Sequence, residues 1–276
     1  MNVFALAQNF VPQQTLSEVA GYLAKSQNKY IKKALVHGFA RAYDIRLDEY
    51  ARTSLDEYDS FNDFFTRELK DGQRPLDTTP NGIACPADGV VSQLGMIKQG
   101  QLVQAKGRDY EVGQLLADFE LGQAFVDGSF ATIYLAPSNY HRVHMPFDGT
   151  LVETRYVPGT LFSVNHTTAE HVPDLFARNE RLVCVFDTQF GTACVVLVGA
   201  MIVAGIECVA TGQIKRTPYI QNRTHSLTLK KGDELGRFYL GSTAIVVLPK
   251  QAGARWLDDM MHGQAVMMGE KIGVFG

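Results

Sequence analysis

The sequence predicts an α+β protein that is mainly β, with a sandwich- or barrel-like β core preceded by amphipathic N-terminal helices. Three observations support this fold class. Apolar residues recur at helical intervals in the N-terminal part, a proline-punctuated stretch follows, and short β-branched runs separated by glycines make up most of the remainder. We therefore divide the chain of 276 residues into a helical, membrane-associating segment, 1–70, and a β-rich domain, 71–276.

The first helical stretch combines a capping signal with a basic face. Thr15-Leu16-Ser17-Glu18 has the spacing of a capping box, in which a side-chain acceptor is followed three residues later by a carboxylate. From Lys25 to Arg41 the chain carries five lysines and arginines and no acidic residue. A basic amphipathic helix of this kind favours an anionic membrane surface as partner, and the alternative is an ordinary surface helix with a solvated basic face.

A second, shorter helix is predicted before the β-rich part. Ser60-Phe61-Asn62-Asp63 forms its cap, and the helix runs through Phe64 and Phe65 to Leu69. Its aromatic side chains either pack inward or face lipid. A loop punctuated by three prolines then separates the helices from the strands.

The β-rich part contains short runs dominated by β-branched and aromatic residues, typical of buried strands. Two helical interruptions are expected, around Val112–Ala117 and Ala169–Asn179. The predicted strands are Val90–Leu94, Ala131–Leu135, Leu182–Phe186, Cys194–Val198 and Ala244–Leu248.

The most apolar run of the chain, Ala193 to Val209, is too short and too interrupted to cross a bilayer. It contains Gly199, Gly205 and Glu207, and a spanning helix needs about 20 apolar residues. We expect two buried strands with a turn near Gly199 instead.

Composition and charge exclude several classes of function. The net charge of −3 and the lack of a broad basic patch argue against nucleic acid as a partner. The four cysteines have no C-x-x-C spacing, which predicts reduced core thiols in a cytosol-facing protein. We predict no metal site, although a site formed by some of the seven histidines stays possible as an alternative. The N-terminal sequence predicts no secretory signal.

The stretch Gly236–Pro249 contains the most distinctive backbone feature. Residues on either side of Leu240-Gly241-Ser242-Thr243 are aromatic or β-branched, which predicts two strands meeting at a sharp Gly-Ser corner. Glycine permits φ > 0 there and leaves the Gly241 carbonyl poorly shielded. The Ser242 hydroxyl can then attack the carbonyl of the preceding peptide bond. A tight turn in a β-rich core is the alternative.

An aspartate and two histidines lie near the ends of other predicted strands. Asp88 precedes a valine-rich strand, as in a turn, whereas His141 and His144 follow a strand that ends at Pro146, where both imidazoles can reach one cleft. Together with Ser242, these are the residue types that activate a nucleophile: a carboxylate fixes the imidazole tautomer, and the imidazole takes the hydroxyl proton. The alternative is that each histidine is an ordinary surface or core residue. The serine lacks a G-x-S-x-G elbow, so hydrolysis of an external substrate is not the natural interpretation.

Seven segments of this chain, in the same order, resemble the bacterial phosphatidylserine decarboxylase family, a group of pyruvoyl enzymes matured by self-cleavage. Each motif alone is weak, but their joint occurrence is highly specific and covers nearly the whole chain from about residue 60. The segments are Phe61-Asn62-Asp63-Phe64-Phe65, Pro86-Ala87-Asp88-Gly89, Gln104-Ala105-Lys106-Gly107, Tyr140-His141-Arg142-Val143-His144-Met145-Pro146, Phe162-Ser163-Val164-Asn165-His166, Phe176-Ala177-Arg178-Asn179-Glu180-Arg181 and Leu240-Gly241-Ser242-Thr243.

The resemblance implies a self-processing mechanism. Asp88 orients His144, His144 deprotonates Ser242, and the chain is cut between Gly241 and Ser242. A β chain, 1–241, and an α chain, 242–276, result, and Ser242 becomes a covalent pyruvoyl group. This cofactor is implied to supply the electron sink for decarboxylation of phosphatidylserine to phosphatidylethanolamine.

The resemblance also implies a substrate site and a location. His141 handles the substrate carboxylate or supplies a proton, and Ser163 and His166 line the substrate pocket. The implied partners are phosphatidylserine and an anionic membrane surface, with the enzyme peripheral on the cytoplasmic face of the cell membrane. The two chains stay together, and a dimer of these units is expected.

Three other interpretations of the sequence remain. A pyruvoyl decarboxylase of a soluble amino acid would share the Gly-Ser cleavage but would not need the basic helices. A serine hydrolase using Asp88, His144 and Ser242 would keep its chain intact. A non-enzymatic β domain would show neither cleavage nor a carbonyl group.

Overall fold

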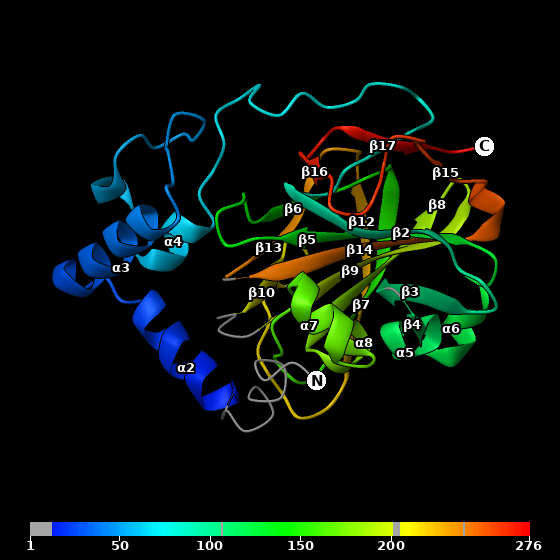
Figure 1. Cartoon of the computed structure of the whole chain (residues 1–276), viewed down its shortest axis with the longest axis horizontal. Helices are drawn as coiled ribbons and strands as arrows, with labels where there is room; N and C mark the ends of the chain where they lie inside the picture. Colours follow the sequence, from blue (N-terminus) through cyan, green and yellow to red (C-terminus); the bar gives the residue numbers. More distant parts are fainter. Residues whose placement is uncertain (1–12, 106, 201–204, 240) are drawn as a thin grey trace.

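The computed structural model of the protein describes residues 13–105, 107–200, 205–239 and 241–276 (Figure 1). Its largest element is an antiparallel sheet of eight strands in the order β12-β7-β8-β9-β14-β5-β2-β16. Each of the five predicted strands lies inside this sheet and is confirmed. The strands are β2 (Gly89–Met96), β5 (Ser129–Leu135), β7 (Gly149–Val157), β8 (Arg181–Thr188), β9 (Gly191–Gly199), β12 (Gln221–Leu229), β14 (Ser242–Leu248) and β16 (Ala265–Val266).

Three smaller sheets accompany the main sheet, and the mainly β prediction is confirmed. Because β12 and β16 are different edge strands of the main sheet, the described part of the chain is layered and does not form a closed barrel. The smaller sheets contain β11 (Gly212–Gln213), β10 (Ile206–Cys208), β13 (Glu234–Phe238) and β6 (Arg142–His144); β1 (Gly82–Ala84), β17 (Lys271–Val274) and β15 (Arg255–Trp256); and β3 (Gln101–Ala105) with β4 (Arg108–Glu111).

Strand β14 separates two hydrophobic cores. Ala244 and Val246 pack into a core shared with β6 and β13, whereas Ile245 and Val247 pack on the other face of the sheet. This alternation follows from the period of two along a strand. All residues of β14 are buried, and each buried aliphatic side chain stabilises the fold by about 1.5–3 kcal/mol. Residue Ser242 at the start of β14 is therefore held in the centre of the protein.

Short helices cover the second face of the main sheet. These are α5 (Val112–Leu116), α6 (Phe119–Gln123), α7 (His166–His171) and α8 (Leu175–Arg178). The helix expected around Val112–Ala117 is confirmed. The helical interruption expected around Ala169–Asn179 is also confirmed, as two short helices, because Pro173 disfavours helical geometry at Val172, which is extended (ψ 116°), and α7 and α8 form on either side.

The N-terminal helices lie beside the β domain (Figure 1) and differ from the prediction at their ends. The capping box is wrong, because Thr15 lies inside α2 (Gln13–Ala24). The basic segment is also not one helix. It is interrupted before α3 (Lys29–Ala42), where the Asn28 side chain accepts hydrogen bonds from the backbone N–H groups of Tyr30 and Ile31.

The third N-terminal helix, α4 (Phe61–Phe65), begins where the sequence predicts. The Ser60 hydroxyl accepts a hydrogen bond from the backbone N–H of Asp63 at 3.1 Å. The helix ends before Leu69. Its aromatic side chains pack inward, against Val36 and Ala40 of α3, so the lipid-facing alternative does not hold for them. Two 3₁₀ turns complete the structure, η1 (Leu55–Glu57) and η2 (Lys250–Ala252).

Among the described residues, no helix combines the length and the hydrophobicity that crossing a membrane requires. The apolar run Ala193 to Val209 contributes β9 and β10, as predicted, although part of the expected turn falls on residues 201–204, outside the described residues. All four cysteines are buried and free, which agrees with the prediction of core thiols.

Candidate active site

The Gly241-Ser242 corner joins two sheets. Strand β13 belongs to the four-stranded sheet and β14 to the main sheet, so the chain must turn sharply between Phe238 and Ser242. Gly241 has φ +49°, in the left-handed region that costs other residues about 1–2 kcal/mol. A Cβ there would meet nothing within 4 Å, so the backbone conformation rather than crowding favours glycine. The predicted corner is confirmed.

The hydroxyl of Ser242 is buried without a hydrogen-bond partner among the described residues. The side chain is 0 % exposed, and the residue is paired with Leu135 of β5 on one side and Gly199 of β9 on the other. Leaving a buried hydroxyl unsatisfied costs about 1–3 kcal/mol. The fold thus maintains an unpaired oxygen one residue after a left-handed glycine.

Asp88 lies directly before β2 and is tied to an arginine. The carboxylate accepts hydrogen bonds from Arg74 Nε, at 3.0 Å to Oδ1, and from Arg74 Nη2, at 2.6 Å to Oδ2, and a further one from the Met268 N–H at 2.9 Å. Arg74 Nη2 also bonds Glu49 at 2.9 Å. These hydrogen bonds, the one to Asp88 foremost, raise the pKa of Arg74. Asp88 is therefore held as a buried ion pair.

The residue after Asp88 must be small. A Cβ at Gly89 would lie 2.3 Å from the carbonyl oxygen of Tyr134 in β5. Glycine allows β2 to approach β5 this closely, and β5 is the strand paired with Ser242. The turn predicted at Asp88-Gly89 is thus the entry of β2 into the main sheet, not a hairpin.

His144 at the end of β6 is held by both ring nitrogens. Nδ1 lies 2.8 Å from the Gly232 carbonyl oxygen, which can only accept, so Nδ1 carries the proton. Nε2 therefore has the lone pair and accepts from the Tyr140 hydroxyl at 3.0 Å. Burial, with a smaller contribution from Arg142, lowers the pKa of His144. The imidazole is a neutral base, with its tautomer fixed by Gly232.

Asp88 and His144 lie close together but are not hydrogen-bonded. The backbone N–H of His144 donates a hydrogen bond to the backbone carbonyl of Pro86 at 2.7 Å, which places β6 against the segment that leads to Asp88. The negative charge of Asp88 acts on His144 through space and slightly opposes the lowering of its pKa. The structure thus brings the two residues together, while Arg74 and Gly232 occupy the hydrogen-bonding groups that they would use with each other.

His141 lies in an apolar contact with the N-terminal helices. Its ring is fully buried and stacks on Phe65 of α4, with centroids 4.1 Å apart. Neither ring nitrogen has a well-formed hydrogen bond among the described residues, although weaker interactions with the backbone of Pro137 and Ala136 act to raise the pKa. Burial, reinforced by the charge of Arg67, lowers the pKa of His141 to about 3. The imidazole is therefore neutral at physiological pH.

The loop that carries Ser163 is fastened beside Ser242. Asn179 Nδ2 donates to the carbonyls of Phe162, at 2.8 Å, and of Gly199, at 2.9 Å, and Gly199 is the β9 partner of Ser242. Ser163 is half-buried in this loop. The loop therefore lies next to the Gly-Ser corner, and its role in a substrate pocket stays a prediction.

His166 begins α7 at the protein surface. Its ring lies 4.8 Å, centroid to centroid, from that of His262, and its Nδ1 lies 3.7 Å from Glu170. The structure therefore places His166 farther into solvent than the other candidate residues. None of the four cavities described for the protein is lined by any of the candidate residues.

Sequence reasoning missed the residues that hold the site together. Arg74 holds Asp88, and Asn179 holds the loop that carries Ser163. Tyr140 and Gly232 both hold the imidazole of His144. Two signals were available, because Tyr140 and Asn179 lie inside the quoted motifs. Arg74 and Gly232 contact residues 14 and 88 positions away, and no local pattern indicates such contacts.

The Arg74–Asp88 pair gives a direct test of this arrangement. In an uncleaved Ser242→Ala background, Arg74→Leu should lower the free energy of unfolding by about 3–5 kcal/mol, because it leaves a buried carboxylate unpaired. Urea denaturation measures this change. Arg74→Leu combined with Asp88→Leu should recover much of the loss. The control Arg46→Leu removes an exposed pair with Asp44 and should change stability by less than about 1 kcal/mol. Equal stability of Arg74→Leu and the parent would contradict the ion-pair assignment.

Comparison with known proteins supports one family for the whole chain. The family model described as phosphatidylserine decarboxylase matches residues 61–274, and a second model, described as PSD, matches residues 3–44. A phosphatidylserine decarboxylase proenzyme from Psychrobacter arcticus is 67% identical over 270 residues, which cover 98% of each chain. The one from Psychrobacter cryohalolentis is 66% identical over 273 residues, 99% of each chain. The one from Acinetobacter baumannii is 54% identical over 271 residues, 98% of this chain and 95% of the relative.

Proposed function

The chain belongs to the phosphatidylserine decarboxylase family, and from this we propose that it decarboxylates phosphatidylserine to phosphatidylethanolamine and CO₂ after cutting itself between Gly241 and Ser242. The observation that carries the proposal is the Ser242 hydroxyl, which is buried, has no hydrogen-bond partner in the described part of the chain and directly follows a left-handed glycine. The word proenzyme in the relatives' names agrees with self-cleavage. A serine hydrolase that used Asp88, His144 and Ser242 would instead keep its chain intact, so cleavage distinguishes the two functions.

Self-cleavage uses groups of the chain itself. Once the Tyr140 hydroxyl has released it, His144 Nε2 takes the Ser242 proton, and the serine oxygen attacks the Gly241 carbonyl carbon. The Gly241–Ser242 C–N bond then breaks as the proton passes to the leaving nitrogen, so that the amide becomes an ester. Elimination removes the Cα proton of residue 242 to a base, breaks its Cβ–O bond and releases a chain ending in the Gly241 carboxylate. The dehydroalanine left at position 242 then takes up water and loses ammonia, which gives an N-terminal pyruvoyl group. In this scheme Asp88 stabilises the imidazolium formed at His144 through its charge.

The two products should remain one folded unit. The α chain, 242–276, would consist of β14, β15, β16 and β17. Strand β14 pairs with β5 and β9, β16 with β2, and β17 with β1, and all of these partners belong to the β chain, 1–241. A cut at the corner therefore leaves the ladders of the main sheet intact. A dimer of such two-chain units and the division of the precursor at residue 70 remain predictions.

The residues at the corner fit a pyruvoyl cofactor, because the Ser242 hydroxyl has no hydrogen-bond partner among the described residues and is available to attack the Gly241 carbonyl. A pyruvoyl group supplies an electron sink for the electron pair released with CO₂. His141 contributes an uncharged N–H and lone pair in an apolar environment, since its pKa is about 3. It can therefore hold the substrate carboxylate without forming an ion pair that would stabilise it against loss of CO₂. We propose that Ser163, on the loop fastened to Gly199, contacts the head group, with His166 at the outer end of the same loop.

The proposed function is tested on the purified protein. Denaturing mass spectrometry should show fragments for residues 1–241 and 242–276, the smaller one blocked to Edman degradation and reducible by borohydride. The same sample should convert phosphatidylserine to phosphatidylethanolamine. Turnover of free serine but not of the lipid would instead favour a decarboxylase of soluble amino acids. Active protein that consists only of the intact chain would overturn the proposal.

We also propose that the enzyme docks peripherally on the cytoplasmic face of the cell membrane. Helix α2 turns small residues, Gly21 and Ala24, toward the protein, whereas Val19 and Tyr22 on its outer face are 54 % and 80 % exposed. An outward apolar face is unfavourable in water and favourable at a lipid surface. The basic helix α3 follows directly.

The electrostatic part of docking is expected to depend on α3. Replacing the exposed Lys29 and Lys33 with glutamate should weaken flotation with anionic vesicles, because each basic residue contributes about 1 kcal/mol near such a surface. Binding to vesicles of neutral phosphatidylcholine serves as the control and should change little. Unaltered flotation with anionic vesicles would rule out a role for these lysines.

A further inference from the structure

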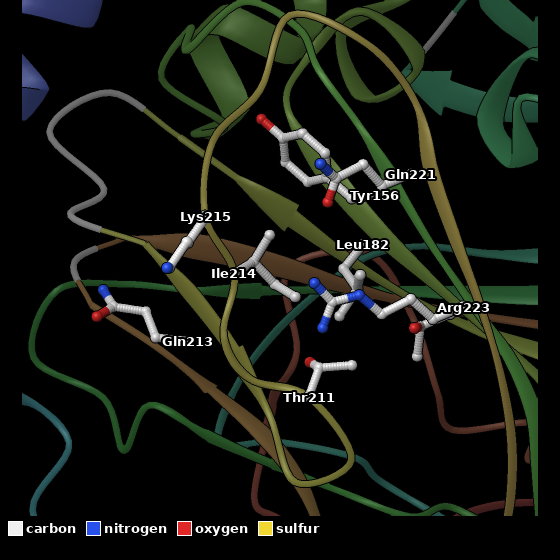
Figure 2. A pocket seen from close by; sticks show the side chains of 9 residues that line it. Tyr156, Leu182, Thr211, Gln213, Ile214, Lys215, Gln221 and Arg223 are labelled. Atoms are coloured by element: carbon white, nitrogen blue, oxygen red, sulfur yellow. The ribbon is translucent and has the colours of Figure 1, made fainter.

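A cavity of about 290 Å³ lies at the β12 edge of the main sheet, apart from the Gly-Ser corner (Figure 2). Its walls come from β7, β8, β11, β12 and the segment after β11. Leu182, Ile214 and Tyr156 form apolar wall, and polar side chains supply the remainder. No candidate active-site residue takes part, so the cavity is a separate feature of the β domain.

The cavity carries positive charge without compensation. Lys215 and Arg223 line it from different segments (Figure 2), with the Lys215 amine on the side of Gln213, and no acidic residue lines it. Neither side chain forms an ion pair with a described residue, and the residues outside the described ranges include no Asp or Glu. The Lys25 Nζ donates to Gln213 Oε1 at 3.0 Å and brings a third cation to the rim. A hollow with such a charge attracts anions.

The neighbouring arginine shows that this charge is not general to the segment. Arg216, next to Lys215, is paired with the buried carboxylate of Glu180, with Nε and Oε2 2.8 Å apart. The adjacent cavity, of about 240 Å³, is lined by Arg216 together with Glu18 and Glu180, so its positive charge is more than compensated. Lys215 and Arg223 have no such carboxylate in their own cavity, and their charge is open to a ligand.

Apolar side chains surround the same region of the surface. Tyr219 and Ile220, in the segment between Lys215 and Arg223, are 62 % and 49 % exposed. The Lys25–Gln213 hydrogen bond places the end of α2, with its outward Tyr22, on the same side. An anion carried by a lipid would satisfy both features, because its phosphate would meet the cations while its acyl part met the apolar side chains.

We propose that this cavity binds the phosphodiester of an anionic membrane lipid, at a site distinct from the one that contains Ser242. The proposal rests on the membrane function proposed above and places part of the docking surface in the β domain. Arg223 offers a planar set of N–H donors and Lys215 a compact charge, the two cation types that bind phosphate, and the Gln221 amide also lines the cavity. The lipid so bound acts as an anchor that sets the β domain against the membrane.

The test compares two charge-matched double variants of the full chain. Lys215→Gln with Arg223→Gln removes the cavity cations. Lys98→Gln with Arg255→Gln removes two exposed cations elsewhere, Lys98 following β2 toward the opposite edge of the main sheet. Flotation is measured with phosphatidylcholine vesicles that contain or lack phosphatidylglycerol. The cavity variant should lose about fivefold in affinity for the anionic vesicles per charge, roughly 25-fold in all, and the control much less.

Self-cleavage and turnover of detergent-dispersed phosphatidylserine separate this proposal from the proposed function. The cavity variant should cleave itself and turn over the dispersed lipid as the parent does. If the unmodified protein did neither, the proposed function would be refuted, whereas the cavity proposal is judged by flotation. The cavity variant should unfold at the same temperature as the parent protein, which shows that it is folded. The single variant Lys215→Gln provides a second, less disruptive test of the same site. Equal losses in the two double variants, or a loss that phosphatidylglycerol does not influence, would overturn the site. Binding of soluble glycerol phosphate without any effect on flotation would overturn the lipid as its occupant.

Discussion

The Ser242→Ala variant is expected to remain a single chain of 30.5 kDa and to show no decarboxylase activity. Alanine has no oxygen with which to attack the Gly241 carbonyl, and without cleavage no pyruvoyl group forms, so both losses should be complete. Denaturing mass spectrometry of freshly purified protein measures the first and release of CO₂ from phosphatidylserine the second. The fold should survive, because the replaced hydroxyl has no hydrogen-bond partner among the described residues.

Thr243 supplies the matched control. Its hydroxyl is also buried and without a partner among the described residues, but it lies one residue farther along β14. Thr243→Val keeps the side-chain shape and should still permit cleavage at Gly241. If Ser242→Ala protein were cut at the same bond, or were active with an ordinary alanine at position 242, the self-cleavage mechanism would have to be abandoned.

The sequence was sufficient to predict the elements whose signals are local. The strands of the main sheet are runs of β-branched residues, and the Gly241 corner is indicated by a glycine between two such runs. The helix ends were less predictable, because several residues along the chain have side chains that can cap a helix and the local sequence does not distinguish between them. Thr15 has the spacing of a cap, yet α2 extends past it, and Asn28 starts a new helix within the basic segment.

In the candidate site, too, local sequence predicted the residues but not the contacts that hold them. Asp88, His141, His144 and Ser242 were identified by residue type and by resemblance, but their partners depend on tertiary contacts. The carbonyl that fixes the His144 tautomer belongs to Gly232, in the turn before β13, and a backbone carbonyl leaves no trace in a residue pattern. The stacking of His141 on Phe65 likewise joins two separate segments.

These contacts give the N-terminal helices a second role. Arg67 is buried and donates to the carbonyls of Ser138, at 3.0 Å, and Asn139, at 3.3 Å, in the loop that leads to His141. Phe65 forms one wall of the His141 site. The segment that we propose to dock on the membrane therefore also shapes the loop between β5, which pairs with Ser242, and β6, which carries His144.

His144→Gln is expected to slow self-cleavage by about 10²–10⁴-fold, because a positioned base is lost while the Gly232 contact can be kept by the amide. The rate is followed as the disappearance of the 30.5 kDa chain after synthesis. His37→Gln, at an exposed histidine of α3 that contacts Asp56, is the control and should be processed normally. Cleavage of His144→Gln at the parental rate would show that another group takes the Ser242 proton.

The pH dependence of cleavage provides an independent check on the same residue. Burial lowers the pKa of His144 below its ordinary value of 6.5, so the neutral, proton-accepting form is already dominant at pH 6.5. The cleavage rate should therefore be level from neutral pH down to about 6.5 and should fall only as the pH drops through the lowered pKa. The fall should be absent from the residual rate of His144→Gln. A rate that already declines between pH 8 and 7 would require a raised pKa, and the neutral imidazole held between Gly232 and Tyr140 could not be the base.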